Sequence, residues 1–138
     1  METRVILVQC TKTKRTQQAP AKQLYDPSAY FRKMRAYAEL KGDEWYILSA
    51  KYGLVHPDAV ISPYNEFGLS EEQAVEIAEK IKADVVELVA GKAYCDPLTP
   101  ELERHGVDVI EPFRGLQIGE RLSALDTRIA GLENKSVV

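Results

Sequence analysis

Thiol, hydroxyl and amine side chains follow the first apolar segment of the chain. The run Val5 to Val8 predicts a buried strand, and Cys10-Thr11-Lys12-Thr13-Lys14 comes soon after it. Lys12 and Lys14 supply point charges, and the hydroxyls and loop amides donate hydrogen bonds, so this loop suits a phosphate group. It lacks the spacing of a Walker loop, and a solvated basic loop is the alternative interpretation. Cys10 is either a thiol activated by the two lysines or a small buried side chain.

A second polar block follows the next apolar segment. The run Trp45 to Ser49 predicts a strand, and Lys51, Tyr52 and Gly53 stand where this strand meets its loop. Gly53 permits a positive φ or a close approach of the backbone to a ligand, and Tyr52 would stack on a base. Lys51 is a further candidate for phosphate binding, and Ser49 is a candidate hydrogen-bonding residue. The alternative is a tight turn in which Tyr52 packs in the core.

Further candidates lie in the loops beyond these blocks. Asp58 and Glu66 are the carboxylates that would position water in a hydrolysis, although a single carboxylate in a loop is more often a turn or cap residue. Tyr64 and Tyr94 would contact a base or pack in the core. Arg114 would clamp an anion or form a surface ion pair.

Strand-like and helix-like segments alternate along the chain, which predicts an α/β fold. Further strands are expected at 85–90 and 106–110, a long loop at 11–24, and a flexible tail from about 133. We therefore expect residues 1–138 to form a single three-layer domain, with a mostly parallel sheet of about four strands flanked by helices. Ligands bind beyond the carboxyl ends of such strands. The residues expected to converge there are Cys10, Lys12, Lys14, Ser49, Lys51, Tyr52, Tyr94 and Arg114.

Local signals predict where the helices begin. Asp26 before Pro27 is typical of an N-cap followed by proline at the first helical position. Ser70 and Gln73 have the spacing of a capping box. Thr99, which also precedes a proline, predicts the start of a short helix by the same reasoning.

Composition narrows the class of protein. A net charge of −3 over 138 residues creates no global basic field, so strong nonspecific binding to nucleic acid is not implied, although a local patch can still bind. No segment approaches the roughly 20 apolar residues of a membrane helix, so no membrane partner is expected. Cys10 and Cys95 are far apart and have no histidine cluster nearby. We therefore expect no disulfide, metal or cofactor, and a cytoplasmic location.

Several of these residues carry resemblances to known families. The segments 48–57 and 61–64 resemble a motif of short uncharacterised bacterial and phage proteins. These proteins share the Cys-Thr-Lys-Thr-Lys start, a segment like 24–28 and an ending like 115–119, so the resemblance covers most of the chain. The Leu-Ser-x-x-Tyr-Gly and Pro-Tyr elements are also similar to those of the YaaA peroxide-stress family. More distantly, the arrangement resembles a uracil-DNA-glycosylase-like domain of archaeosine-synthase-type enzymes, in which loops at strand ends handle a nucleobase.

Three hypotheses of function follow. The first is an enzyme that processes a nucleobase, a nucleotide or a modified base in DNA, most concretely by hydrolysis of an N-glycosidic bond. The second is a non-catalytic DNA-binding protein of stress response or phage biology, which the resemblance to the YaaA family implies. Members of that family are longer, and this chain lacks the length for their additional helical DNA-binding elements. The third is a structural or partner-binding protein. The first two have a nucleobase, nucleotide or nucleic acid as partner.

Overall fold

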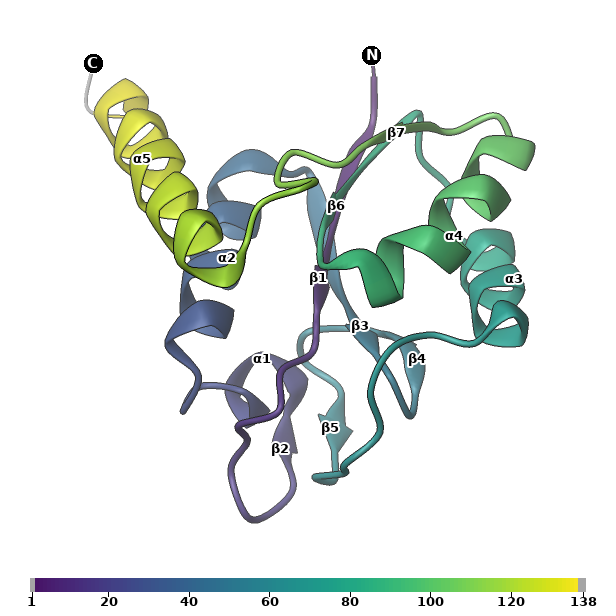
Figure 1. Ribbon diagram of the computed structural model, residues 1–138, viewed down its shortest axis with the longest axis horizontal. Helices are drawn as coiled ribbons and strands as arrows, with labels where there is room; N and C mark the ends of the chain where they lie inside the picture. Colours follow the sequence, from purple (N-terminus) through teal and green to yellow (C-terminus); the bar gives the residue numbers. More distant parts are fainter. Residues whose placement is uncertain (1, 137–138) are drawn as a thin grey trace.

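Four apolar segments form the parallel part of the central sheet, and the sheet has five strands in the order β4-β3-β1-β6-β7 (Figure 1). The parallel strands are β1 (Arg4–Gln9), β3 (Glu44–Ser49), β6 (Val85–Val89) and β7 (Asp108–Ile110). The edge strand β4 (Gly53–Val55) runs antiparallel to β3. The computed structural model describes residues 2–136. The expected α/β fold with a mostly parallel sheet is confirmed, and β4 is an addition formed by the turn after β3.

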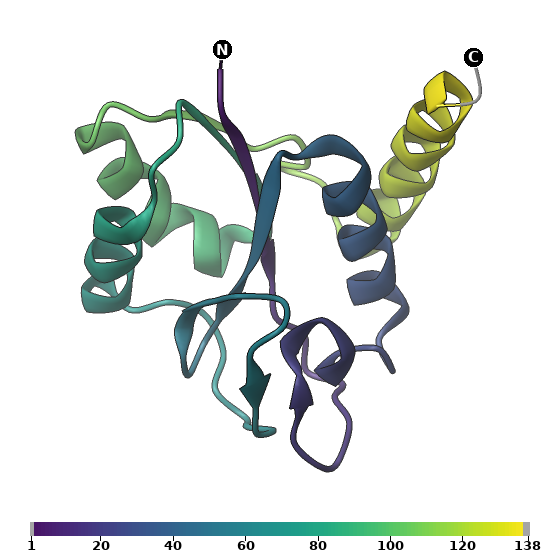
Figure 2. The same ribbon diagram turned by 180° about the vertical axis from the view of Figure 1, so that it is seen from behind.

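Helices cover both faces of the sheet, which makes three layers (Figures 1 and 2). One face carries α2 (Ala29–Lys41) and α5 (Ile118–Ser136), and the other carries α3 (Glu71–Lys80) and α4 (Lys92–Arg104). Residues 133–136 of the expected flexible tail belong to α5, and residues 137–138 lie outside the described residues. None of the helices within residues 2–136 is long and apolar enough to cross a membrane.

The segment between β1 and α2 was predicted as a loop, but it contains a strand and a helical turn. Its strand β2 (Ala19–Pro20) pairs antiparallel with β5 (Val60–Ile61), and α1 (Ala21–Leu24) follows at once. The amide of Ala21 donates to the carbonyl of Ala59 at 2.8 Å. These bonds join segments about forty residues apart, so no local periodicity in the sequence reveals them.

Two helix starts show where local capping signals succeed and fail. In α3 the predicted capping box is present: Ser70 Oγ accepts from the Gln73 amide at 3.1 Å, and Gln73 Oε1 accepts from the Ser70 amide at 2.9 Å. In α2 the N-cap is Ser28, whose hydroxyl accepts from an amide three residues later at 3.2 Å. The prediction of Asp26 as this cap is wrong, because its carboxylate accepts from the Arg15 guanidinium at 3.3 Å.

Helix α4 begins at Lys92, seven residues before the start predicted at Thr99, and therefore contains two prolines. Pro97 has no N–H to donate to the Ala93 carbonyl four residues earlier. That carbonyl accepts instead from the Leu69 amide at 3.2 Å, in the loop before α3. A tertiary hydrogen bond thus satisfies the carbonyl that Pro97 leaves free, which explains why the helix continues through a residue that normally ends one.

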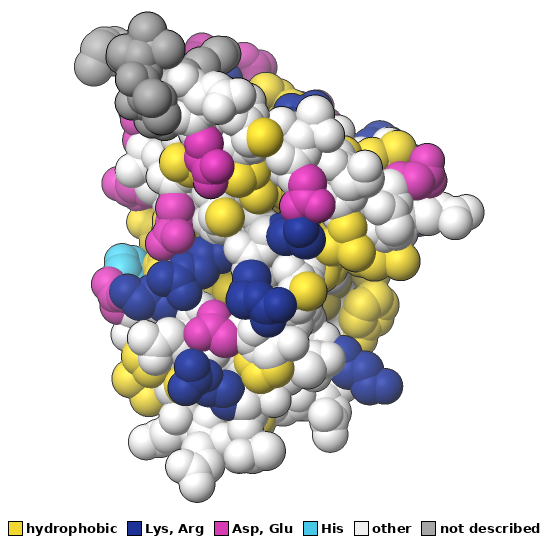
Figure 3. Space-filling view, turned by 90° about the vertical axis from the view of Figure 1, so that its left-hand side faces the viewer, with side chains coloured by type: hydrophobic (Ala, Val, Ile, Leu, Met, Phe, Trp, Pro, Cys, Tyr) yellow, Lys and Arg dark blue, Asp and Glu magenta, His cyan; other side chains and the backbone are white. Residues whose placement is uncertain are grey.

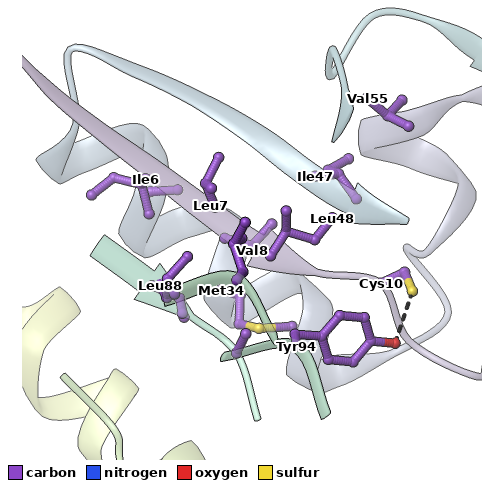
Figure 4. Packing of buried hydrophobic residues seen from close by; sticks show 14 of the residues in the cluster. Ile6, Leu7, Val8, Cys10, Met34, Ile47, Leu48, Val55, Leu88 and Tyr94 are labelled. Atoms are coloured by element: carbon purple, nitrogen blue, oxygen red, sulfur yellow. Dashed lines mark hydrogen bonds between the residues drawn. The ribbon is translucent and has the colours of Figure 1, made fainter. Parts of the chain in front are cut away.

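The core lies on both faces of β1. Ile6, Leu7 and Val8 are fully buried, and Figure 4 shows them packed among residues of the neighbouring strands and α2. Burial on both faces is typical of a central parallel strand and explains the continuous apolar run in the sequence. At the carboxyl end of β1 this packing gives way to a polar contact between Cys10 and Tyr94.

Candidate functional site

A cavity of about 630 Å³, called the main cavity below, opens beyond the carboxyl end of β1. Its walls come from the end of β1 and the loop after it, the start of α2, the loop before α3, and the starts of α4 and α5. Its volume lies within the range of roughly 300–1,000 Å³ that is usual for small-molecule sites. The position agrees with the general rule for ligand binding in open parallel sheets.

Five of the residues predicted for a site line the main cavity. They are Cys10, Lys12, Lys14, Glu66 and Tyr94. The side chains of Lys12 and Glu66 are exposed, whereas Cys10 and Tyr94 are buried. The structure therefore places one carboxylate, two cations, one thiol and one phenol around a single hollow.

Tyr94 connects the wall of the main cavity to the loop before α3. Its hydroxyl lies 3.2 Å from Cys10 Sγ and accepts from the Gly68 amide at 3.1 Å (Figure 4). The Phe67 ring stands edge-on to the Tyr94 ring, with 5.7 Å between centroids, and is 78% exposed. Burial raises the pKa of the Tyr94 hydroxyl above its usual range. The exposed ring of Phe67 therefore packs against Tyr94, whose hydroxyl is fixed by its contacts with Cys10 and Gly68.

Lys14 is positioned by two aromatic rings. Its Nζ lies 4.5 Å from the centroid of the Tyr64 ring and 5.9 Å from that of Tyr25, which are cation–π distances. Burial lowers the pKa of Lys14, and the nearby Cys10 and Glu66 oppose this shift. The ring of Tyr64 thus contacts Lys14, a cation that lines the main cavity.

Ser49 and Tyr64 do not line the main cavity, although the Tyr64 ring contacts Lys14, which does. The fully buried Ser49 hydroxyl donates to the Tyr64 hydroxyl at 2.8 Å and accepts from the amides of Lys51 at 3.2 Å and Tyr52 at 2.9 Å. The Tyr64 hydroxyl is also 2.6 Å from that of Tyr25. Both residues were predicted to bind the ligand. In the structure they instead link the turn after β3 to the Tyr64 ring that contacts Lys14.

Three predicted site residues lie away from the main cavity. Lys51 and Tyr52 are exposed on the turn between β3 and β4, with Lys51 Nζ 5.3 Å from the centroid of the Tyr52 ring. Tyr52 is 40% exposed, and its ring stands edge-on to that of the buried Tyr64, with 5.6 Å between the centroids. Asp58 is exposed and forms an ion pair with Lys22 at 2.7 Å. The hydrogen bond from Lys22 lowers the pKa of Asp58. The expectation of convergence is therefore wrong for Lys51 and Tyr52, and Asp58, a candidate catalytic carboxylate, also lies outside the main cavity.

Arg114 borders a second hollow of about 320 Å³, called the side cavity below. Its guanidinium is exposed and donates to Glu111 at 2.6 Å, which is the surface ion pair foreseen as the alternative to an anion clamp. Gly53, in contrast, has the positive φ that the sequence suggested, at 77°. Arg121 lines both cavities.

Sequence reasoning missed several residues of the main cavity. Gln9, Tyr30, Phe67 and Arg121 belong to its lining. Gln9 Oε1 accepts from the Gly91 amide at 2.6 Å and so ties the end of β1 to the end of β6. A polar residue at a strand end and an aromatic one beside Glu66 were visible signals. Nothing local distinguishes Arg121 from the other arginines of the chain, because only the packing of α5 brings it to the cavity.

Charges of both signs are mixed on one side of the molecule. Figure 3 shows the side of the molecule that carries α2 and α5, where Lys and Arg side chains are mixed with Asp and Glu. Lys33 of α2 pairs with Asp126 of α5, and Arg35 pairs with Glu39 at 3.4 Å. This side therefore has no uniformly basic surface. Within residues 2–136, no group of three or more His, Cys, Asp or Glu side chains is arranged to hold a metal ion.

The comparisons with known proteins agree with the first of the resemblances. No curated protein and no solved structure matches the chain. The profile of a protein family, however, matches residues 5–127, which include every strand except the first residue of β1, as well as both cavities. The chain therefore belongs to the family of unknown function DUF6884.

Proposed function

We propose that the main cavity binds a nucleotide, free or within nucleic acid, and hydrolyses its N-glycosidic bond. One observation carries the proposal: Lys12, Lys14, Glu66 and the exposed ring of Phe67 line the same hollow of about 630 Å³. Cations suit a phosphate, an exposed ring suits a base, and a carboxylate in the same cavity suits the sugar. The distant resemblance to uracil-DNA-glycosylase-like domains supports the same chemistry.

Glu66 has the central role in this reaction. Water adds its hydroxyl to the anomeric carbon as the bond to the base nitrogen breaks, and the leaving base takes up the remaining proton. A carboxylate beside the sugar both orients the water and stabilises the positive charge that develops on the sugar ring. Of the two carboxylates that the sequence suggested, only Glu66 lines the main cavity, because Asp58 is paired with Lys22 elsewhere.

Base release tests the reaction. The protein is incubated with nucleosides, nucleotides and base-modified DNA, and free base is measured by mass spectrometry. Glu66→Gln is expected to lower turnover roughly 100-fold or more while ligand binding persists. Asp58→Asn is the matched control and should leave turnover unchanged. Absence of free base from every substrate with the unaltered protein would rule the reaction out.

Ligand binding tests the cavity independently of turnover. Lys12→Ala should weaken binding of a nucleoside monophosphate about tenfold in calorimetry, because a charged contact to phosphate is lost. Lys51→Ala, which removes an exposed lysine outside the cavity, should bind as the unaltered protein does. Phe67→Ala should also weaken binding, with Tyr46→Ala, which removes an aromatic ring outside the main cavity, as its control. Equal losses from the two lysine variants would argue against this cavity as the site.

A second candidate function is binding of single-stranded nucleic acid without turnover. The 78% exposure of Phe67 at a cavity lined by lysines favours it, since stacking on an exposed ring and cationic contacts to the backbone suffice for such binding. The resemblance to the DNA-binding YaaA family points the same way. Retention of DNA that falls steeply with salt, together with no released base, would select this function over the first.

A further inference from the structure

Arg121 forms part of the wall between the two cavities. It lies near the start of α5, is partly buried, and lines both the main cavity and the side cavity. Its Nε donates to the Leu116 carbonyl at 2.9 Å, which fixes one edge of the guanidinium. Its Nη1 lies 3.5 Å from the Tyr30 hydroxyl, at the outer limit of a hydrogen bond. The outer end of the guanidinium, with Nη1 and Nη2, therefore keeps most of its donors for another acceptor.

Arg121 differs from the other cations of the side cavity in having no carboxylate partner. Arg114 pairs with Glu111 at 2.6 Å, and Lys92 lies 4.0 Å from Asp96. Among the residues that the structure describes, Arg121 forms no ion pair, and its hydrogen-bond acceptors are neutral oxygens. A partly buried guanidinium without a counter-charge keeps donors that an anion from outside the chain can accept.

Gly91 makes room for this guanidinium. A Cβ at position 91 would lie 2.9 Å from Nη1 of Arg121 and 3.3 Å from Gln9 Oε1, closer than such atoms normally approach. The backbone of Gly91 does not itself require glycine, since its φ of −84° and ψ of 177° suit any residue. Glycine at position 91 therefore leaves space for the Arg121 guanidinium, and the backbone conformation does not require it.

We infer that Arg121 binds a phosphate group of the ligand through Nη1 and Nη2, at the point where the main and side cavities meet. The planar end of a guanidinium matches two phosphate oxygens, whereas Lys12 and Lys14 act as point charges that attract the anion. Tyr30 also lines the main cavity beside Arg121, so its hydroxyl can donate to the same anion. The inference deepens the proposed function by naming the residue that holds the phosphate.

Titration with inorganic phosphate tests the inference without any nucleoside. Binding to the full chain is followed by calorimetry or by NMR chemical shifts. Arg121→Met should weaken phosphate binding roughly 10- to 100-fold, and Arg121→Lys should lose less. Gly91→Ala should weaken binding severalfold, although it removes no charge, because its methyl group displaces the guanidinium. Its urea unfolding should stay close to that of the unaltered protein, since the displaced atoms are the ends of flexible side chains.

Two matched controls separate the placement of Arg121 from general effects. Arg114→Met removes an arginine that already has a carboxylate partner, and Gly119→Ala adds a methyl group where no atom lies within 4 Å. Both should bind phosphate as the unaltered protein does. Phosphate binding within twofold of the unaltered protein by either Arg121→Met or Gly91→Ala would overturn the inference. So would the absence of any phosphate binding by the unaltered protein.

The failure of this inference can be told from the failure of the proposed reaction. Inorganic phosphate has no glycosidic bond, so its binding does not depend on turnover. Phosphate binding that requires Arg121, without base release from any substrate, would sustain the inference and refute the reaction. Base release together with phosphate binding that does not change in Arg121→Met would sustain the reaction and refute the inference.

Discussion

Replacement of Ser49 by alanine gives the clearest test of how the site is supported. The Ser49 side chain is fully buried and makes three hydrogen bonds: one donated to Tyr64 and two accepted from the amides of Lys51 and Tyr52. The substitution removes one oxygen atom and leaves the surrounding apolar packing in place. Any loss of stability therefore reports the hydrogen bonds and not a large cavity.

The expected magnitude follows from what each partner can do next. The Tyr64 hydroxyl keeps Tyr25 as a partner at 2.6 Å, so it is not left unsatisfied. The two amides lose their acceptor, but Lys51 and Tyr52 are exposed, so water can replace it in part. A net hydrogen bond contributes about 0.5–1.5 kcal/mol, so we expect Ser49→Ala to lower the free energy of unfolding by about 2–3 kcal/mol.

Urea unfolding followed by circular dichroism measures this change. A loss of about 2–3 kcal/mol moves the midpoint down by about 1–2 M urea at the slope usual for a small domain. Ser62→Ala is the control, because Ser62 lies in the same block of the sequence and is exposed. A loss below about 0.5 kcal/mol for Ser49→Ala would refute the reasoning. In a double-mutant cycle with Tyr64→Phe, a coupling energy near zero would show that the Ser49–Tyr64 bond contributes nothing.

Three further predictions concern other parts of the fold. Gly53→Ala should cost about 1–2 kcal/mol in urea unfolding, because φ is 77° at this turn, whereas Gly131→Ala in α5 should not destabilise. Glu87→Gln should cost about 3 kcal/mol, because Glu87 is buried 2.5 Å from both Arg4 and the Tyr37 hydroxyl, yet phosphate binding should persist. Burial raises the pKa of Cys95 from 9.0 to about 12, so in a variant without Cys10 iodoacetamide should modify Cys95 at pH 8 only in urea. Between pH 9 and 12 the unfolded chain loses this proton while the folded chain keeps it, so stability should fall as pH rises, and Cys95→Ala should flatten that slope.

Signals that act within a few residues were interpreted correctly when nothing distant competed for the same atoms. The capping box of Ser70 and Gln73 closes on itself, and Gly53 needs only its own backbone freedom. Asp26 has an equally good capping side chain, but the guanidinium of Arg15 competes for its carboxylate. Thr99 likewise precedes a proline without starting a helix, because its hydroxyl donates to Glu111 and α4 has already begun. Local chemistry states what a side chain can do, and distant partners decide whether it does so.

Some residues of the candidate site were likewise predictable from local sequence, and others were not. Cys10, Lys12 and Lys14 follow a buried parallel strand, so their place at the carboxyl edge of the sheet was predictable from the chain alone. Arg114 was the arginine that the sequence suggested as an anion clamp, but Arg121 is the one that lines the main cavity. Arg114 is not available to clamp an anion because it pairs with Glu111, and no spacing in the sequence reveals that ion pair.

The alternation of apolar runs with polar segments by itself predicted the α/β class, the mostly parallel sheet and the sheet edge at which several candidate site residues lie. These follow from periodicity and burial, which are properties of each segment taken alone. The tertiary structure decided which side chains are available at that edge. It pairs Asp58 with Lys22, buries Ser49 in a hydrogen bond to Tyr64, and leaves Arg121 without an ion pair among the described residues. The physical reason is that the availability of a charge depends on its neighbours in space, and folding brings those neighbours from distant parts of the chain.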